Sequence, residues 1–401
     1  MIELRPQPVG IFSLPVSYLL LPPAPNGAVA HRALLAGKIP EQWPDAWQFY
    51  ALALAGDLDG AWSALAPESS ALASYNRFVL RSSPEEYSTL KGILPCELQP
   101  LLDTVAYTLG YLNLPPAHTD ATNEILALLL MTQASACLEQ EDSQSAIQLL
   151  QAASQAASTA SPILAALLQG AMAEAMRNQQ GATPQLIQLY QCVIGQLKNS
   201  DLEINCAEFT LGLGSCYHEL ANGQRGALME AVRYYQEALQ VLTRENAPEL
   251  YALAHNNLAL AYLAMPMNEA SDQLRMGIAV QSLREALKIY NRQQQPELWS
   301  SAQLNLANAL QHLPSSHPED NLVEAVERYE DLLSVRSRAD DPIGFARLLA
   351  NQGNALAHLG IYEHATPKLN EALNLFSMYG HGEEAGVIAD LLREIEMKHE
   401  T

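Results

Sequence analysis

The chain has few aromatic residues and few basic ones. Aromatics make up 6% of its 401 residues, and Lys and Arg together number 22 against 44 Asp and Glu, which gives a formal net charge of −22. Nucleic-acid binding depends largely on clustered Lys and Arg that neutralise phosphates, so this balance argues against a nucleic-acid partner. The same balance disfavours binding to an anionic membrane surface.

Cysteines and long apolar runs are also scarce. The five cysteines are scattered without a C-x-x-C pair, and most lie in apolar helical patterns, which favours a reducing compartment. No run of 18 or more apolar residues occurs, so we expect no membrane span and no membrane partner. Near the N-terminus, Glu3 and several prolines interrupt the apolar stretch that a signal peptide needs. We therefore expect a cytoplasmic protein.

The common catalytic and metal-binding motifs are missing. The sequence contains no H-E-x-x-H, no G-x-x-x-x-G-K-[ST] and no G-x-S-x-G. Gly212-Leu213-Gly214 resembles part of a dinucleotide-binding loop, but it lacks a third glycine and a preceding strand, so we interpret it as helix packing. We expect a non-enzymatic protein with no cofactor and no metal. An enzyme concealed in residues 1–116 is the alternative.

Alanine, by contrast, is abundant and recurs in a fixed phrase. The phrase is an alanine, a large residue four positions on, and a small or apolar residue three further. Spacings of four and seven place all three side chains on one face of a helix. The copies are Ala146/Leu150/Ala153, Ala231/Tyr235/Ala238, Ala279/Leu283/Ala286, Ala325/Tyr329/Leu332 and Ala365/Leu369/Ala372. A unit of this length that recurs along a chain is typical of a stacked array of helix pairs.

A second signature precedes each copy of the first. It is a small residue three positions before a larger one, which allows a partner helix to approach closely. The instances are Ala134/Cys137, Gly214/Tyr217, Ala259/Tyr262, Ala307/Leu310 and Gly353/Leu356. Together the two signatures predict six helix pairs over 121–380, at 121–140 with 142–159, 160–179 with 183–199, 201–220 with 227–244, 248–265 with 275–291, 296–313 with 319–337, and 341–359 with 362–379.

The ends of the chain differ from this array. Residues 1–30 are rich in proline and predict an extended segment that lies against the first helices. Residues 28–116 predict an irregular helical region, because prolines cut its apolar segments. Residues 383–399 predict one last amphipathic helix that caps the array.

The paired signatures resemble those of the tetratricopeptide repeat family, in particular its bacterial variants with longer loops. The first helix of that repeat has a small residue with Tyr three positions on, and the second has Ala, an aromatic or Leu, then Ala. The resemblance covers about two thirds of the chain and implies an all-α fold, a right-handed α-solenoid of antiparallel helix pairs. It also implies a scaffold that binds peptides or protein segments in the concave groove lined by the first helices.

Asparagines recur on the face that would line this groove. Asn257, Asn305 and Asn351 stand at the same place in three consecutive repeats, two before the small residue. Nearby positions on the same stripe hold Asn308, His312, Arg347, Asn354 and His358. An amide can both donate to and accept from the backbone of an extended ligand, as in the asparagine ladder of peptide-binding members such as kinesin light chains. Alternatively, these asparagines bond neighbouring helices or water.

The leading hypothesis is therefore a cytoplasmic adaptor or scaffold that binds a protein or peptide and assists the assembly or maturation of a larger complex. One alternative is a repeat-type regulator that senses a small signalling peptide or metabolite, although the sequence shows no basic recognition helix. Another is a structural protein that self-assembles through its terminal faces.

Overall fold

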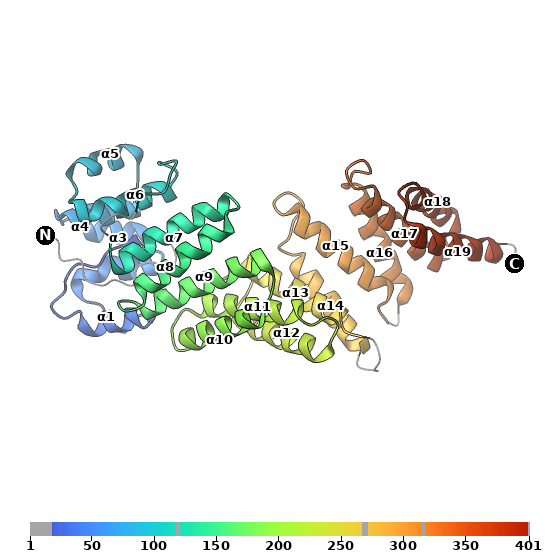
Figure 1. Ribbon diagram of the computed structural model, residues 1–401, viewed down its shortest axis with the longest axis horizontal. Coiled ribbons are helices and arrows are strands. Elements are labelled where there is room, and N and C mark those ends of the chain that lie inside the picture. The colour runs from blue at the N-terminus through green and yellow to red at the C-terminus, as the bar shows by residue number, and fades with distance from the viewer. Residues whose placement is uncertain (1–17, 118–120, 267–271, 315–316, 400–401) are drawn as a thin grey trace. The chain divides into compact units, whose positions relative to one another are not determined.

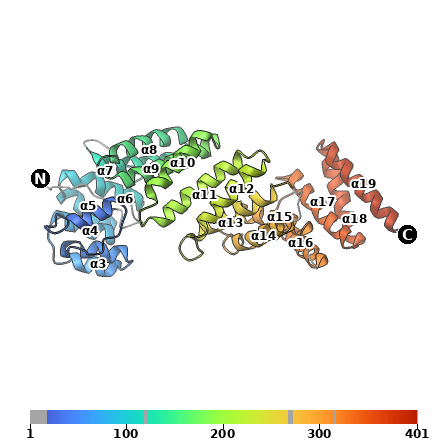
Figure 2. The same cartoon turned by 90° about the horizontal axis from the view of Figure 1, so that it is seen from below.

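The computed structural model describes residues 18–117, 121–266, 272–314 and 317–399 (Figure 1). Within these ranges every regular element is a helix, and within each unit most consecutive helices contact each other (Figure 2). The all-α, helix-pair class predicted from the sequence is thereby confirmed. None of the described helices is long and apolar enough to cross a membrane.

The chain divides into two compact units, residues 1–220 and 221–401. The described part of the first unit contains α1 (Ala28–Leu35), α2 (Gln48–Leu54), α3 (Leu58–Leu65), α4 (Ala71–Leu80), α5 (Pro84–Ile93), α6 (Gln99–Thr108), α7 (Asn123–Glu139), α8 (Ser143–Ala157), α9 (Pro162–Gln180), α10 (Pro184–Leu197) and α11 (Glu203–Glu219), with 3-10 turns η2 (Asp45–Trp47) and η3 (Cys96–Leu98). The boundaries at 30, 116 and 121 that the sequence suggested stay a prediction.

The second unit continues the alternation of first and second helices. It contains α12 (Arg225–Ala238), α13 (Pro248–Leu263), α14 (Asp272–Ala286), α15 (Pro296–Gln311), α16 (Pro318–Leu333), α17 (Pro342–His358), α18 (Tyr362–Met378) and α19 (Gly382–His399). Most of these helices begin within two or three residues of the predicted positions. Proline is the first residue of α13, α15, α16 and α17, where its missing N–H costs no helical hydrogen bond.

Three second helices end four to six residues earlier than predicted. The helix α12 ends at Ala238, α14 at Ala286 and α16 at Leu333. Apolar residues continue beyond each end, which is why the periodicity suggested longer helices. The helix instead ends in a turn in which a side-chain oxygen accepts a hydrogen bond from the backbone. After α12, for example, Thr243 Oγ1 accepts from the N–H of Asn246 at 3.2 Å.

The core consists of the repeated phrases. Every residue of the five alanine-centred triads is 3% exposed or less. In α17 the small residue packs against the triad of α18: a Cβ added at Gly353 would lie 2.7 Å from Cγ of Leu369. The repeat thus uses a missing side chain to bring two helices into close contact.

A buried network replaces this contact between α9, α10 and α11. In the first and last predicted pairs, the small residue of the first helix stands twelve residues before the first alanine of the second helix. Glu174 stands twelve residues before Leu186, so Glu174 takes the place of the small residue. Its Oε1 accepts a 2.6 Å hydrogen bond from the Tyr190 hydroxyl, and its Oε2 lies 3.0 Å from Arg177. A Cβ at Gly212 would lie 2.3 Å from Glu174 Oε1. The sequence of this pair is irregular because a carboxylate, Glu174, stands where the five regular pairs have a small residue.

The described part of the N-terminal segment forms no regular element from residue 19 to residue 24, and α1 begins at Ala28. An extended segment over 1–30 stays a prediction. Leu19, Leu20 and Leu21 are 1–3% exposed. The side chain of Asn76 in α4 accepts from the N–H of Leu20 at 2.8 Å and donates to its carbonyl at 2.7 Å. Trp47 Nε1 donates to the carbonyl of Pro22 at 2.7 Å. Backbone groups of this segment are thus satisfied by side chains rather than by a sheet.

We expect Gly212→Ala to destabilise the first unit by about 1–3 kcal/mol, because the new methyl group overlaps the Glu174 carboxylate and the Tyr190 ring. Urea unfolding followed by circular dichroism measures the change. Gly195→Ala in α10 is the matched control, since nothing lies within 4 Å of the position of its Cβ. That variant should be neutral or more stable by up to about 1 kcal/mol. Equal effects of the two variants would contradict this account.

Glu208 in α11 makes stability depend on pH. Burial raises the pKa of its carboxyl above the ordinary value of 4.5, and the negative charge of Glu174 raises it further. The folded state thus holds this proton more tightly than the unfolded state, so the contribution is present at low pH and is lost as pH rises through the raised pKa. We expect Glu208→Gln to flatten that decline in unfolding free energy, measured by urea titration at several pH values. Glu203→Gln, at an exposed carboxyl of the same helix, should keep the wild-type pH profile.

Candidate functional site

The predicted asparagines lie on α13, α15 and α17, the first helices of three consecutive pairs in the second unit. The helices α13 and α15 contact each other. Side-chain hydrogen bonds join α15 to α17, as described below. The first helices therefore form one surface within this unit, and we call it the first-helix surface.

A chain of hydrogen bonds crosses this surface between α15 and α17. Oδ1 of Asn308 accepts from the Tyr329 hydroxyl at 2.6 Å and from Nδ2 of Asn351 at 3.1 Å. The Tyr329 hydroxyl accepts in turn from Nε2 of Gln311 at 2.5 Å, and Oε1 of Gln311 accepts from Nδ2 of Asn354 at 3.2 Å. Bonding between neighbouring helices, which the sequence left open as an alternative, is therefore present for Asn308, Asn351 and Asn354.

The same asparagines keep part of their hydrogen-bonding capacity. Asn308 uses its carbonyl oxygen, whereas Asn351 and Asn354 use their amide nitrogens. Each has the opposite half of its amide left for a further bond. Asn305 is half-buried on α15 and makes no side-chain hydrogen bond within the described residues. Oδ1 of Asn257 accepts from Nδ2 of Asn256 at 3.4 Å.

The remaining predicted residues lie at the margins of the first-helix surface. His312 is the C-cap residue of α15 and His358 is the last residue of α17, and both are exposed. Arg347 is exposed and lies 3.5 Å from Glu384 on α19, so it points toward the last helix rather than toward α15. The structure thus brings Asn308, Asn351 and Asn354 together. The two histidines and the arginine lie outside that group.

Two residues of the network were missed from the sequence. Tyr329 was recognised as a core residue of its triad, but its hydroxyl was not considered. Gln311 stands three residues after Asn308, at the spacing that keeps side chains on one helix face, so the i, i+3 pattern could have found it. Burial raises the pKa of Tyr329 well above its ordinary value, so its hydroxyl stays protonated and donates to Asn308.

The second helices are joined by charged groups instead. Glu324 of α16 lies 2.6 Å from Arg284 of α14 and 3.1 Å from Arg328 of its own helix. Glu330 of α16 accepts from Gln352 at 2.6 Å and lies 3.3 Å from Lys368 of α18. The hydrogen bond from Gln352 lowers the pKa of Glu330 despite partial burial, and Lys368 lowers it further. Hydrogen bonds between amide side chains thus join the first helices, whereas ion pairs join the second helices.

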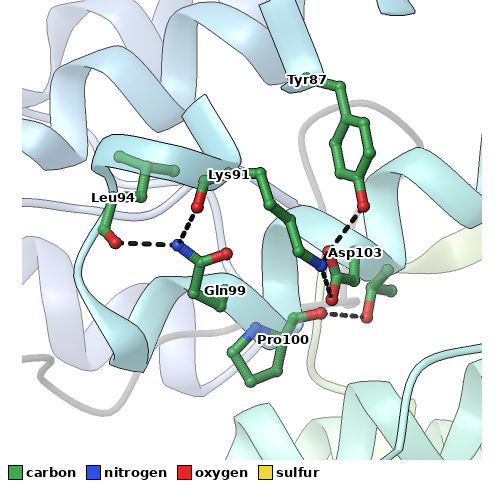
Figure 3. Close-up of polar contacts among 7 residues, drawn as sticks. Tyr87, Lys91, Leu94, Gln99, Pro100 and Asp103 are labelled. Carbon is green, nitrogen blue, oxygen red and sulfur yellow. Dashed lines mark hydrogen bonds and ion pairs between the residues drawn. The ribbon is translucent and has the colours of Figure 1, made fainter. Parts of the chain in front are cut away.

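A cluster of titratable groups also lies between α5 and α6. In the first unit, Lys91 of α5 lies 2.5 Å from Oδ1 of Asp103 in α6, and the Tyr87 hydroxyl donates to the same atom at 3.0 Å (Figure 3). Burial lowers the pKa of Lys91, but the hydrogen bonds and negative charges of Asp103 and Tyr87 together outweigh it, so this pKa is raised. Burial raises the pKa of Tyr87. Gln99 joins this cluster by bonding the carbonyls of Lys91 and Leu94 at 3.0 and 2.8 Å.

No group of three or more His, Cys, Asp or Glu side chains is placed to hold a metal ion in the part of the chain that the structure describes.

Comparisons with known proteins find similar structures but no similar sequences. No known family profile and no curated protein matches the chain. Among solved structures, it is similar to a Rap protein complexed with competence and sporulation factor (TM-score 0.43, 14% identity, 88% of this chain and 96% of that one). It is also similar to the TPR2AB domain of yeast Sti1 in its pHSP90 complex (0.26, 17%, 68% and 98%) and to a human IFIT1 dimer with m7Gppp-AAAA (0.32, 15%, 93% and 97%). At these scores the likenesses decide nothing about the ligand.

We expect Tyr329→Phe to lower the unfolding free energy of the second unit by about 1–2 kcal/mol, because it removes the hydroxyl that Asn308 and Gln311 share inside the packed helices. Thermal or urea unfolding measures the loss. Tyr379→Phe is the matched control, since Tyr379 is 51% exposed and its hydroxyl makes no hydrogen bond within the described residues. A Tyr329→Phe protein as stable as the control would show that the network contributes nothing.

Proposed function

We propose that this protein is a non-enzymatic scaffold that holds an extended peptide or protein segment on the first-helix surface of its second unit. The observation that supports it most is the set of amide groups on α15 and α17 that face each other and still have unused donors and acceptors. Asn305, Asn308, Asn351 and Asn354 would bond the backbone of the bound segment. Amides at this spacing bind an extended backbone with little regard to its side chains.

The chain's own N-terminal segment supports the chemistry of this proposal. Asn76 bonds both the N–H and the carbonyl of Leu20, a residue outside any regular element. One asparagine on a helix therefore satisfies both backbone groups of one residue in this same fold. A bound segment would meet the same chemistry in the asparagines of the first-helix surface.

The network between α15 and α17 gives these amides fixed positions before any ligand arrives. Because Asn308 is bonded by both Tyr329 and Asn351, its amide nitrogen points in a direction set by the helices. Preorganised groups lose less conformational entropy on binding than free side chains do. A role in the assembly of a larger complex agrees with this kind of surface, and the bound partner would be a protein with an accessible extended segment.

We expect Asn305→Ala to weaken binding of the natural partner about fivefold to tenfold, because a backbone group of the ligand would lose its amide partner. The partner is first identified by affinity purification and mass spectrometry, and its affinity for each variant is then measured with purified protein by calorimetry. Asn305 makes no side-chain hydrogen bond within the described residues, so the melting temperature should not change.

The matched control is Asn370→Ala, which removes an exposed asparagine from the second helix α18. It should bind as the wild type does. Equal affinity of the Asn305→Ala and wild-type proteins, or retention of no partner by the wild type, would contradict the proposal.

A further inference from the structure

The connections that precede α13, α15 and α17 share one turn. Each has a hydroxyl or amide residue, an arginine, and a proline four residues after the arginine, and the proline begins the next first helix. The three turns are Thr243-Arg244 to Pro248, Asn291-Arg292 to Pro296 and Ser337-Arg338 to Pro342. In each, the side-chain oxygen of the first residue accepts from the N–H groups two and three residues on, at 2.9–3.3 Å. The turn therefore presents its arginine in the same way in three successive repeats.

The three arginines differ in what they contact. Arg338 lies 2.9 Å from Glu371 of α18. Arg244 and Arg292 are exposed and form no ion pair or side-chain hydrogen bond within the described residues. Arg292 differs further from Arg244, because it lines a cleft.

This cleft lies between the start of α15 and the segment that follows α16. Its volume is about 550 Å³. Trp299, Leu304 and Val335 form its apolar wall and are each half-buried. Trp299 and Leu304 also pack against the core of the second unit, which fixes the wall in place. The cleft is large enough for one or two amino-acid side chains, and its wall offers them an aromatic and aliphatic contact.

The polar side of the cleft is formed by two arginines and one carboxylate. Arg292 and Arg336 line it together with Glu297. Arg336 lies 3.3 Å from Asp341, whose other oxygen is occupied by the N–H of Gly344 at the start of α17. That ion pair is exposed, and exposed pairs contribute little, so Arg336 can turn to a second anion. Arg292 has no partner to give up.

The cleft also meets the first-helix surface. Ser301 lines the cleft and stands four residues before Asn305, so the two side chains lie on one stripe of α15. A segment bound by the asparagines can thus place one of its side chains in the cleft. The rim residues Arg292, Glu297 and Ser301 are exposed, so the ligand chain can pass through rather than end there.

We propose that this cleft binds the carboxylate side chain of an aspartate or glutamate that is flanked by apolar residues in an extended protein segment. Arg292 and Arg336 donate to the carboxylate, and Trp299 packs against the neighbouring apolar side chain. The inference rests on the proposed function and adds to it the residue types that the ligand must have. Charge-assisted bonds to guanidinium groups favour a carboxylate over the isosteric amide.

The test uses the full chain and fluorescein-labelled seven-residue peptides with amidated C-termini. The first peptide has a central aspartate between leucines with alanines outside, and its partner has asparagine in the centre. A third carries phosphoserine in the centre, and a fourth is the asparagine peptide with a free C-terminal carboxylate. Fluorescence anisotropy gives the four affinities. We expect the aspartate peptide to bind about tenfold more tightly than the asparagine peptide.

Protein variants then assign the difference to the cleft. Arg292→Ala should abolish the preference for aspartate, and Arg292→Lys should restore part of it. Arg244→Ala is the matched control, because Arg244 occupies the same position of the same turn but does not line the cleft, and it should keep the preference. The inference is wrong if the aspartate and asparagine peptides bind equally or not at all. It is also wrong if the phosphoserine or free-carboxylate peptide binds more tightly than the aspartate peptide. A third contradicting result is that Arg292→Ala and Arg244→Ala have the same effect.

Asn305→Ala separates this inference from the proposed function. If Asn305→Ala weakens binding of all four peptides while Arg292→Ala changes nothing, the scaffold role stands and the role of the cleft fails. If Arg292→Ala alone acts, the cleft binds an acidic side chain without the asparagines.

Discussion

Close contact between a small residue on one helix and an alanine-centred face on the next is the constraint on which the repeats depend. The alanines of the five triads are 0–1% exposed, and Gly353 leaves room for Leu369 where any side chain would overlap it. Protein interiors are packed as densely as organic crystals, so the smallest side chains set the distance between helices. A larger residue at these positions would separate the pair and leave its neighbours without contacts.

Two tyrosine hydroxyls inside these interfaces have polar partners on the first helices. The Tyr329 hydroxyl, at the centre of one triad, meets Asn308 and Gln311, and the Tyr190 hydroxyl meets Glu174. Burying a hydroxyl without a hydrogen-bond partner would cost more free energy than one hydrogen bond contributes. The partner of each of these two tyrosines is an amide or a carboxylate of a first helix. In the second unit such amides make the first-helix surface polar although it lies next to the core.

The two sides of the second unit consequently differ in chemistry. Short amide side chains bridge α15 and α17, whereas Arg284 and Lys368 reach from α14 and α18 to carboxylates of α16. Amides bind an uncharged backbone, and the paired charges are already satisfied by one another. This difference is the reason for which we propose the first-helix surface, rather than the surface of the second helices, as the side that binds a segment. The cleft of Trp299 adds a place for one side chain to a surface that otherwise offers contacts to the backbone.

The sequence by itself determined the helices and their buried faces. Spacings of three, four and seven act within one helix and prolines mark helix starts, so local rules were enough for α13, α15 and α17. The ends of α12, α14 and α16 were predicted too late, because apolar residues continue into the turns that follow. Only the tertiary structure decided the partners of the asparagines. Asn308 and Asn351 are 43 residues apart. Trp299 and Val335 line one cleft because the start of α15 lies beside the segment that follows α16. Which side chains meet across repeats depends on the register between helices, and that register is set by packing and loop length, which no short sequence window contains.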